Sequence, residues 1–241
     1  MSSYIEIKKE LQRVVQPHRA FSKFCKTGQG QYAEHDQFLG VPVPDIRKLA
    51  LKYKDLPIQE IQILIDSRHN EERQLALFIL TRRYEKGSEQ DRDFFHQYYL
   101  KNIKQINNWN LVDSSAHLII GAHVMQQENS DILFTLARSP VLWERRIAMV
   151  ATWWFIRKGS LDLSLMIAEV LLSDTQDLIH KAVGWMLREV GKRKQAYLTA
   201  FLDQHAHNMP RTALRYAIEK LSTEQKQYYL SFKSKKQACQ V

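Results

Sequence analysis

Residues 179–190 read IHKAVGWMLREV and carry the clearest helical pattern in the chain. Their apolar side chains recur at i, i+4, i+7, i+8 and i+11, a spacing that places them on one face of an α-helix. Residues 143–154 repeat this spacing, and residues 111–122 repeat it more weakly. Strand-like alternation does not extend over any useful length. The pattern therefore predicts an all-α protein.

Five segments open in a comparable way and suggest an internal repeat. They are RQLALFIL, DSSAHLII, RIAMVATW, KAVGWMLR and RTALRYAI, and their first residues are Arg73, Asp113, Arg146, Lys181 and Arg211. Successive openings lie about 30 to 40 residues apart, which is room for two helices and two turns. This spacing predicts an α-solenoid of HEAT-like helical hairpins, in which each unit buries its apolar face against its neighbours. An irregular helical bundle is the structural alternative.

The bulk composition is that of a folded protein without a linker. The chain has 241 residues, 44% of them hydrophobic and 25% charged, with 8 Gly and 6 Pro. No Pro- or Gly/Ser-rich stretch divides it, so we expect a single helical-repeat domain over residues 1–241. The last residues, FKSKKQACQV, are expected to form a flexible basic tail that adds nonspecific affinity for DNA.

Several protein classes are disfavoured by what the sequence lacks. The longest apolar run, residues 147–156, is too short to span a bilayer, and the polar N-terminus carries no signal-peptide core. Two cysteines, Cys25 and Cys239, provide neither a disulfide framework nor a metal quartet. We therefore expect a cytoplasmic protein with no membrane segment, no metal and no cofactor. Nothing in the sequence demands a dimer, so a monomer is expected.

The net charge favours a polyanionic partner. The formal charge is +9 and the isoelectric point is near 9.5, and each phosphate that a cation neutralises releases condensed counterions. In the repeat register, Arg73, Arg146, Lys181 and Arg211 would form a row of cations on a concave basic face. Asp113 is the exception in that row. A general solubility charge is the simpler alternative.

Aromatic and charged side chains share helical faces near these positions. Trp109 and Asp113 stand at i and i+4, and Lys181, Trp185 and Arg188 stand at i, i+4 and i+7. Core packing is the usual explanation of a tryptophan at helical spacing. Trp143 and Trp154 lie on the apolar stripe and are assigned to the core, whereas Trp109 and Trp185 lie off it.

A carboxylate among phosphate-binding cations is repelled by DNA unless a positive charge lies next to it. For Asp113, an ion pair with Arg146 of the next repeat would suffice. The functional alternative is a cationic substrate: N3- and N7-alkylated purines carry positive charge, and their loss gives the deoxyribose oxocarbenium character. A carboxylate could stabilise that charge and orient the attacking water. Neighbouring indole faces would attract the same cation.

Other candidate sites are weaker. Ser114, Ser115 and His117 have the composition of a hydrolase triad, but residues so close on one helix point in different directions. His205 and His207 lack a third metal ligand nearby. Lys181 could form a Schiff base with an abasic sugar, although a phosphate contact is the simpler role.

At these residues the chain resembles the DNA alkylation repair family, the AlkD-type DNA glycosylases built from HEAT-like repeats. The resemblance rests on five ordered segments from about residue 20 to residue 221: FLGVPVPDIRKLA, NNWNLVDSSA, LWERRIAMVATWW, LIHKAVGWMLREVGK and HAHNMPRTALRYAIEKL. There are departures. The stretch KTGQGQYAEHDQFLGV is similar to a widespread branch of the family, and Asn110 stands where the glycosylase-like pattern has an acidic residue.

The resemblance implies roles for individual residues. The catalytic aspartate falls on Asp113, the site tryptophans fall on Trp109 and Trp185, and the DNA-contacting arginine falls on Arg146 or the adjacent Arg145. Such proteins remove cationic N3- and N7-alkylpurines from duplex DNA without a metal and without a deep pocket.

We therefore expect a monofunctional alkylpurine DNA glycosylase that acts on double-stranded DNA. The residues expected to bind the DNA are Arg146, Arg145, Lys181, Arg188, Arg211 and Arg73. One alternative is a noncatalytic module that recognises branched or damaged DNA with the same face. A protein-interaction scaffold is the other alternative.

Overall fold

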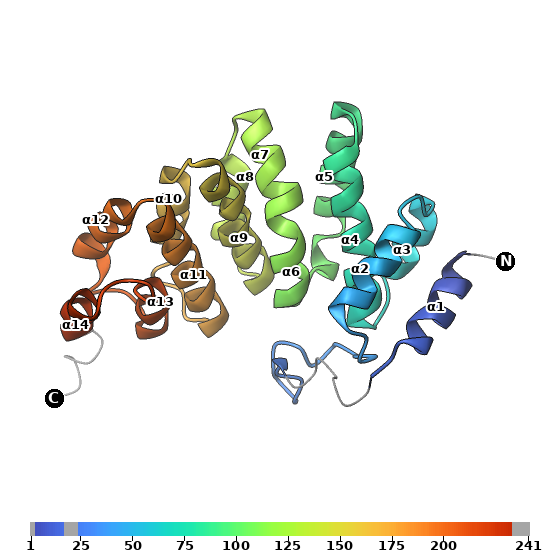
Figure 1. Cartoon of the computed structure of the whole chain (residues 1–241), viewed down its shortest axis with the longest axis horizontal. Coiled ribbons are helices and arrows are strands. Elements are labelled where there is room, and N and C mark those ends of the chain that lie inside the picture. Colours follow the sequence, from blue (N-terminus) through green and yellow to red (C-terminus); the bar gives the residue numbers. More distant parts are fainter. Residues whose placement is uncertain (1–2, 17–23, 233–241) are drawn as a thin grey trace. The chain divides into compact units, whose positions relative to one another are not determined.

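The structure, a computed structural model, describes residues 3–16 and 24–232. Within these ranges the regular structure is helical, and the one β pairing is an isolated bridge between Gln37 and His69. Figure 1 accordingly shows coiled ribbons and no arrows. The predicted all-α fold class is confirmed. Among the described helices, none combines the length and the apolar character that a bilayer-spanning segment needs.

The chain forms two compact units, Met1–Ile119 and Ile120–Val241, which we describe separately. The expected organisation as a single domain stays a prediction. The basic tail expected at the C-terminus lies outside the described residues except for Phe232, and so does Cys239.

The first unit is built around one buried helix. Its elements are α1 (Ser3–Arg13), α2 (Val43–Lys52), α3 (Ile58–Ile65), α4 (Asn70–Lys86), α5 (Glu89–Lys101), a 3-10 turn (Ile103–Gln105) and α6 (Trp109–Ala116). Helix α4 packs against α2, α3, α5 and α6. It therefore buries 13 of its 17 residues, including charged ones in its first turn. A helix that is covered on all sides needs no amphipathic stripe.

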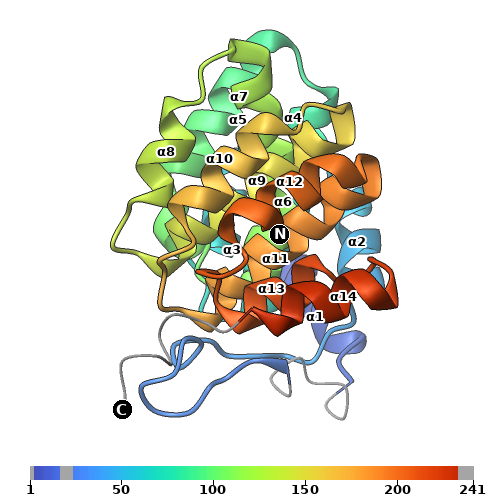
Figure 2. The same ribbon diagram turned by 90° about the vertical axis from the view of Figure 1, so that its left-hand side faces the viewer.

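The second unit consists of two layers of helices. Its elements are α7 (Ala122–Gln127), α8 (Asp131–Ala137), α9 (Leu142–Lys158), α10 (Asp162–Val170), α11 (Asp177–Arg193), α12 (Gln195–His205), α13 (Arg211–Ala217) and α14 (Thr223–Ser231). Helix α11 packs between α9 and α13, and α8, α10 and α12 cover these helices. Figure 2 shows α10 and α12 above α11 and α13.

The periodic segments of the sequence form helices, with one interruption. Residues 179–190 lie in α11 and residues 143–154 lie in α9. The weaker segment, 111–122, is interrupted after α6 by a π-helical turn at His117–Gly121. Two serines precede that turn, and their hydroxyls donate to backbone carbonyls of α6, a type of bond that often bends helices.

The repeat register holds at three helices and shifts at α4, where Arg73 stands three positions after the first residue, and at α13. Asp113, Arg146 and Lys181 each follow the first residue of their helix by four positions (109 to 113, 142 to 146, 177 to 181). Arg211 is instead the first residue of α13. The residue of α13 in the shared register is therefore Arg215, which is exposed. Arg211 opens both its sequence segment and its helix, so this expected start is correct. The other segments open inside their helices, because the apolar pattern does not mark the first turn.

Gly184 explains how closely α11 and α13 approach. A Cβ atom at this position would lie 2.5 Å from the Cβ of Tyr216, and closer still to the carbonyl oxygen of Ala213. Only a residue without a side chain permits this packing. The glycine precedes Trp185, so it helps to fix the helix that carries this candidate residue.

Two tryptophans, Trp143 and Trp154, were assigned to the core from the sequence, and they differ in burial. Trp143 is buried, which confirms its assignment. Trp154 is only half-buried. Its ring lies beside Arg157 and Lys158, at 5.7 and 5.1 Å from ring centroid to cation. The apolar stripe predicted the face of the helix on which Trp154 lies, but not the fraction of its side chain that neighbouring residues cover.

Candidate active site and DNA-contacting residues

Helix α6 carries two of the predicted catalytic residues, Trp109 and Asp113. They lie one turn apart on one face, as their spacing predicted, and both are half-buried. Helix α6 begins at Trp109 because Asn108 has an extended backbone and its side-chain Oδ1 accepts a hydrogen bond from the Trp109 N–H at 2.7 Å.

A buried polar network lies beneath the first residues of α6. The Asp36 side chain has no exposed surface and forms an ion pair with Arg73. It also accepts hydrogen bonds from Asn108 Nδ2 at 2.5 Å and from Asn70 Nδ2 at 2.9 Å. Asn70 is further paired with Asn110, whose Nδ2 lies 2.6 Å from Asn70 Oδ1. The buried carboxylate is therefore compensated by one guanidinium and two amides.

Arg73 belongs to this network and does not face solvent. Only 4% of its surface is exposed, and its Nη1 donates to the carbonyl oxygen of Ser67 at 2.8 Å. Partners inside the first unit therefore engage this guanidinium, and a phosphate could not reach it there. We do not include Arg73 among the proposed DNA contacts. A sequence pattern could not reveal this, because the partner lies 37 residues away.

Tyr99 lies next to α6 at the level of Ser115. Its hydroxyl is 3.0 Å from the Ser115 hydroxyl. Burial raises the pKa of Tyr99, and the negative charge of Asp113 raises it further. Tyr99 therefore stays protonated, and Asp113 lies close enough to influence it. Both Ser114 and Ser115 use their hydroxyls to bond helix carbonyls. This arrangement does not support a serine nucleophile.

In the second unit, Arg145 and Arg146 fix the start of α9 to the segment before α11 and to the first turn of α11. Arg145 Nε forms an ion pair with Asp174 at 2.6 Å, and its Nη1 donates to Ser139 O at 2.9 Å. Arg146 is buried, with 5% of its surface exposed, and its Nη1 donates to Leu178 O at 2.5 Å. Both guanidiniums therefore hold backbone in place, and Arg145 is the more exposed of the two.

Helix α11 carries three predicted site residues along one side. Lys181 Nζ lies 2.8 Å from Asp177 Oδ2, and this contact is the main reason why the pKa of Asp177 is lowered. Trp185 is half-buried. Arg188 forms an ion pair with Glu219, which follows α13.

Trp153 of α9 contacts one of the candidate residues, although its sequence pattern did not single it out. Its ring centroid lies 5.1 Å from that of Trp185, with the two ring planes inclined by 59°. Arg157 lies 6.0 Å from the same Trp153 ring. Trp153 follows Arg146 by seven positions, so helical spacing placed both on one side of α9. The spacing did not indicate the contact with Trp185.

Arg211 is engaged at the end of the chain. Its Nη1 and Nη2 donate to Phe232 O at 3.1 Å and to Leu230 O at 3.0 Å. These carbonyls belong to the C-terminal end of α14 and the residue after it, where a cation also meets the negative end of the helix dipole. Arg211 thus ties α13 to α14, and Arg215 is the exposed cation of α13.

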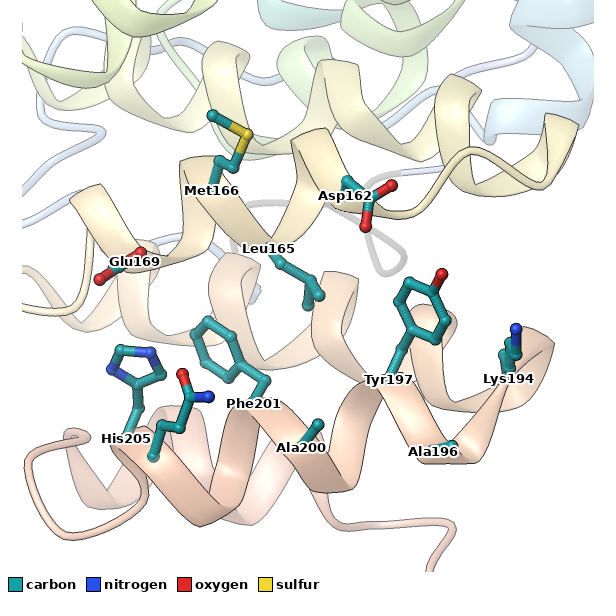
Figure 3. A pocket seen from close by; sticks show the side chains of 11 residues that line it. Asp162, Leu165, Met166, Glu169, Lys194, Ala196, Tyr197, Ala200, Phe201 and His205 are labelled. Atoms are coloured by element: carbon teal, nitrogen blue, oxygen red, sulfur yellow. The ribbon is translucent and has the colours of Figure 1, made fainter.

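A cavity of 550 Å³ lies between α10 and α12, away from all of these residues. Figure 3 shows Leu165, Tyr197 and Phe201 along its wall and the carboxylates of Asp162 and Glu169 near its rim. The cavity is also lined by one lysine, Lys194, so it is not the basic surface that a phosphate backbone would need. His205, a weak metal candidate, lines this cavity and packs on Phe201 at 4.5 Å between ring centroids. In the described part of the chain, no group of three or more metal-ligating side chains gathers.

Comparison with known proteins gives a family match and a likeness to solved structures. Residues 7–221 match the family described as DNA alkylation repair enzyme. Among solved structures, the chain is similar to a predicted DNA alkylation repair enzyme from Enterococcus faecalis. The two share 18% sequence identity with a TM-score of 0.66, over 87% of this chain and 97% of the other. At this identity the likeness concerns the fold alone. No functionally curated protein matches the chain.

The family match spans both compact units and every candidate residue described above. It agrees with the resemblance that five sequence segments had indicated. The chain belongs to the DNA alkylation repair enzyme family.

Proposed function

We propose that this protein is a DNA glycosylase that hydrolyses the N-glycosidic bond of cationic N3- and N7-alkylpurines in duplex DNA. Membership of the DNA alkylation repair enzyme family supports a role in the repair of alkylated DNA. One observation carries the more specific proposal. A half-buried carboxylate, Asp113, stands one turn from Trp109 on a helix whose first residue is fixed by a buried network.

The reaction breaks the bond between C1′ of the deoxyribose and the purine nitrogen. The bonding electrons go to the purine, which leaves as a neutral base because it began as a cation. Positive charge then develops on the sugar, where the Asp113 carboxylate stabilises it. A water molecule adds to C1′ and releases a proton to the carboxylate or to solvent. The products are the free base and an abasic site.

The tryptophans would hold the cationic base. An indole face attracts a nearby cation by about 0.5–2 kcal/mol. The backbone of Trp109 is fixed by Asn108, and the ring of Trp185 packs against the ring of Trp153. The family resemblance assigns Trp109 and Trp185 to binding the lesion, and within the second unit we assign Trp153 to positioning Trp185.

The cations of the second unit would bind the backbone of duplex DNA. Lys181 is the best placed, since its side chain is 41% exposed and its partner Asp177 is also exposed at 55%. An ion pair of this kind is weak, so a phosphate can compete with it. Arg188 is paired with an exposed carboxylate in the same way. Arg145 and Arg146 hold the start of α9 against the beginning of α11, the helix from which Lys181 and Arg188 would make these contacts.

The test is release of free base from duplex DNA that contains N7-methylguanine. Wild-type protein is expected to release the base, and Asp113→Asn is expected to lose this activity while keeping its affinity for DNA. Asp131→Asn, at an exposed carboxylate in the first turn of α8, serves as a control and should behave as wild type. Absence of release by wild type, or full release by Asp113→Asn, contradicts the proposal.

A second function would use the exposed cations without the reaction. Lys181 and Arg215 keep exposed surface on α11 and α13, whereas Arg145 has an internal partner in Asp174. A module that recognises branched or damaged DNA without cutting it would need no more than a basic face. This alternative predicts tight, salt-sensitive binding without base loss. Undetectable affinity for DNA at low salt would instead favour a protein-interaction scaffold.

A further inference from the structure

The segment Phe24–Asp36 lies against the end of α6 that carries Trp109. The Cys25 sulfur is 3.9 Å from Asn108 Oδ1 and 3.7 Å from Asn108 Nδ2, and the same Oδ1 accepts from the Trp109 N–H. The side chain that caps α6 therefore also holds the beginning of this segment. Cys25 itself is buried, so it is an anchor and not part of the exposed surface.

The far end of the segment is anchored just as firmly. Asp36 is bound by Arg73 and by two asparagines within the buried network. The next residue, Gln37, accepts a backbone hydrogen bond from Asn70 at 2.9 Å and donates one to Arg68 at 3.1 Å. The Glu71 carboxylate then accepts from the N–H groups of Leu39 and Gly40 at 3.0 and 2.8 Å. The segment is thereby fixed to the first turn of α4.

Between its anchors the segment is closed by its own hydrogen bonds. The Ala33 N–H donates to Lys26 O at 3.0 Å, and the Gly28 N–H donates to Gln31 Oε1 at 3.0 Å. The Gly30 N–H donates to Glu34 Oε2 at 2.7 Å, with a φ of +72° that favours glycine. These bonds give the turn a defined shape.

This turn presents an exposed aromatic side chain close to an exposed lysine. Phe24 is 71% exposed, more than any other large hydrophobic residue in the described part of the chain. Lys26 is exposed two positions later. An exposed aromatic ring followed by a cation suits nucleic acid, because the ring can stack on a base or wedge into a base step while the cation meets a phosphate.

We propose that the segment Phe24–Gly30 is a second DNA-contacting element, in which Phe24 packs against a base exposed at the lesion and Lys26 contacts a phosphate. The inference rests on the proposed function, since it assumes that the Trp109 end of α6 faces DNA. It adds to that function a residue that would favour damaged over intact duplex. In intact DNA the bases are stacked on each other and offer an aromatic ring no free face.

The experiment compares Phe24→Ala with Phe94→Ala. Phe94, in α5 of the same unit, is 50% exposed and is the matched control. The probes are two duplexes of one sequence, one intact and one with a tetrahydrofuran abasic-site analogue. Fluorescence anisotropy measures the dissociation constant of each, and thermal unfolding checks that both variants fold.

Phe24→Ala is expected to bind the abasic duplex about tenfold more weakly while its affinity for intact duplex changes by less than about twofold. Phe24→Tyr, which keeps the ring, should bind both as wild type does, and so should Phe94→Ala. Lys26→Ala should weaken binding to both duplexes and reduce the dependence of log K on log salt by about one. The proposal is overturned if Phe24→Ala binds the abasic duplex as wild type does, or if its affinity falls by the same factor for both duplexes.

Binding to the abasic duplex requires no turnover, so the two proposals fail separately. If wild type releases no base but Phe24→Ala loses abasic binding selectively, the glycosylase proposal fails and the contact stands. If wild type releases base and Phe24→Ala is indistinguishable from it in binding, the contact fails alone.

Discussion

Asp36 and Arg73 form an ion pair inside the first unit, with side-chain exposures of 0% and 5%. The pair connects a segment before α2 to the first turn of α4, and through Asn108 it reaches the residue that begins α6. A buried pair of this kind contributes little net stability relative to well-packed apolar side chains, yet losing one partner is costly.

Replacing Asp36 with Asn should lower the free energy of unfolding by about 3–5 kcal/mol, because Arg73 would remain buried without its counter-charge. Urea denaturation followed by circular dichroism measures the change. The double variant Asp36→Asn/Arg73→Met should recover much of the loss, since it removes the charge that was left alone. A single variant within about 1 kcal/mol of wild type would show that the pair is dispensable.

Trp153→Ala should slow base release although it leaves Trp109 and Asp113 untouched. Loss of the ring that lies 5.1 Å from Trp185 frees that side chain to leave its position, and small displacements of a positioning group can reduce rates by about tenfold or more. Single-turnover release from N7-methylguanine duplex measures the rate. Trp153→Phe should retain most of it.

Trp154 provides the control for that prediction. It is half-buried on the same helix, and its ring meets Arg157 and Lys158. Trp154→Ala should therefore release base at a rate near that of wild type. Equal losses in Trp153→Ala and Trp154→Ala would assign the effect to helix stability and not to Trp185.

Asp177→Asn should tighten binding to duplex DNA by a few fold. The change removes a negative charge near the phosphates and frees Lys181, which lies 2.8 Å from the Asp177 carboxylate. Since the Lys181 hydrogen bond lowers the pKa of Asp177, this carboxylate is ionised at neutral pH. The gain should therefore stay constant across the neutral pH range, as anisotropy titrations at several pH values would show. Weaker binding by Asp177→Asn would mean that the ion pair holds Lys181 in its DNA-binding position.

The Cys25 thiol should resist alkylating reagents in the folded protein. Burial raises its pKa to about 11 from the ordinary value of 9.0. At mildly alkaline pH this shift lowers the thiolate fraction by about a hundredfold, and the thiolate is the reactive form. Labelling of a Cys239→Ser variant, with and without urea, isolates Cys25. Equal rates in the two conditions would show that the anchor at Asn108 opens freely.

The same pKa shift sets the sign of a stability effect. A raised pKa in the folded state favours the neutral thiol there, so the contribution of Cys25 is present below pH 9.0 and is lost as the pH rises towards about 11. Cys25→Ser should be less sensitive to pH in that window. Thermal unfolding at alkaline pH provides the comparison.

Most of the helical framework could be predicted from the sequence, because apolar periodicity is a local property. Residues 179–190 and 143–154 form helices where the spacing placed them. Trp109 and Asp113 share a face for the same reason. Helix starts were less accessible, as Lys181 shows: it opens its sequence segment but lies four residues inside α11. The first turn of a helix is set by capping and by contacts outside the helix.

The buried network was not accessible from the sequence. Asp36 looks like an ordinary polar residue in a turn-rich stretch, and its partners lie more than 30 positions away. Asn110, noted as a departure from an acidic pattern, is buried and paired with Asn70. Its amide can donate as well as accept, which a carboxylate at that position could not do.

The capped start of α6 also has a consequence for the order of folding. Its contacts with Asp36 and Cys25 join positions separated by 72 and 83 residues. Helices form within about a microsecond, whereas contacts between distant positions require the closure of long loops. Refolding chains should therefore regain their helical signal before the indole of Trp109 reaches its native environment. The native environment of Trp109, on which the proposed activity depends, would be regained last.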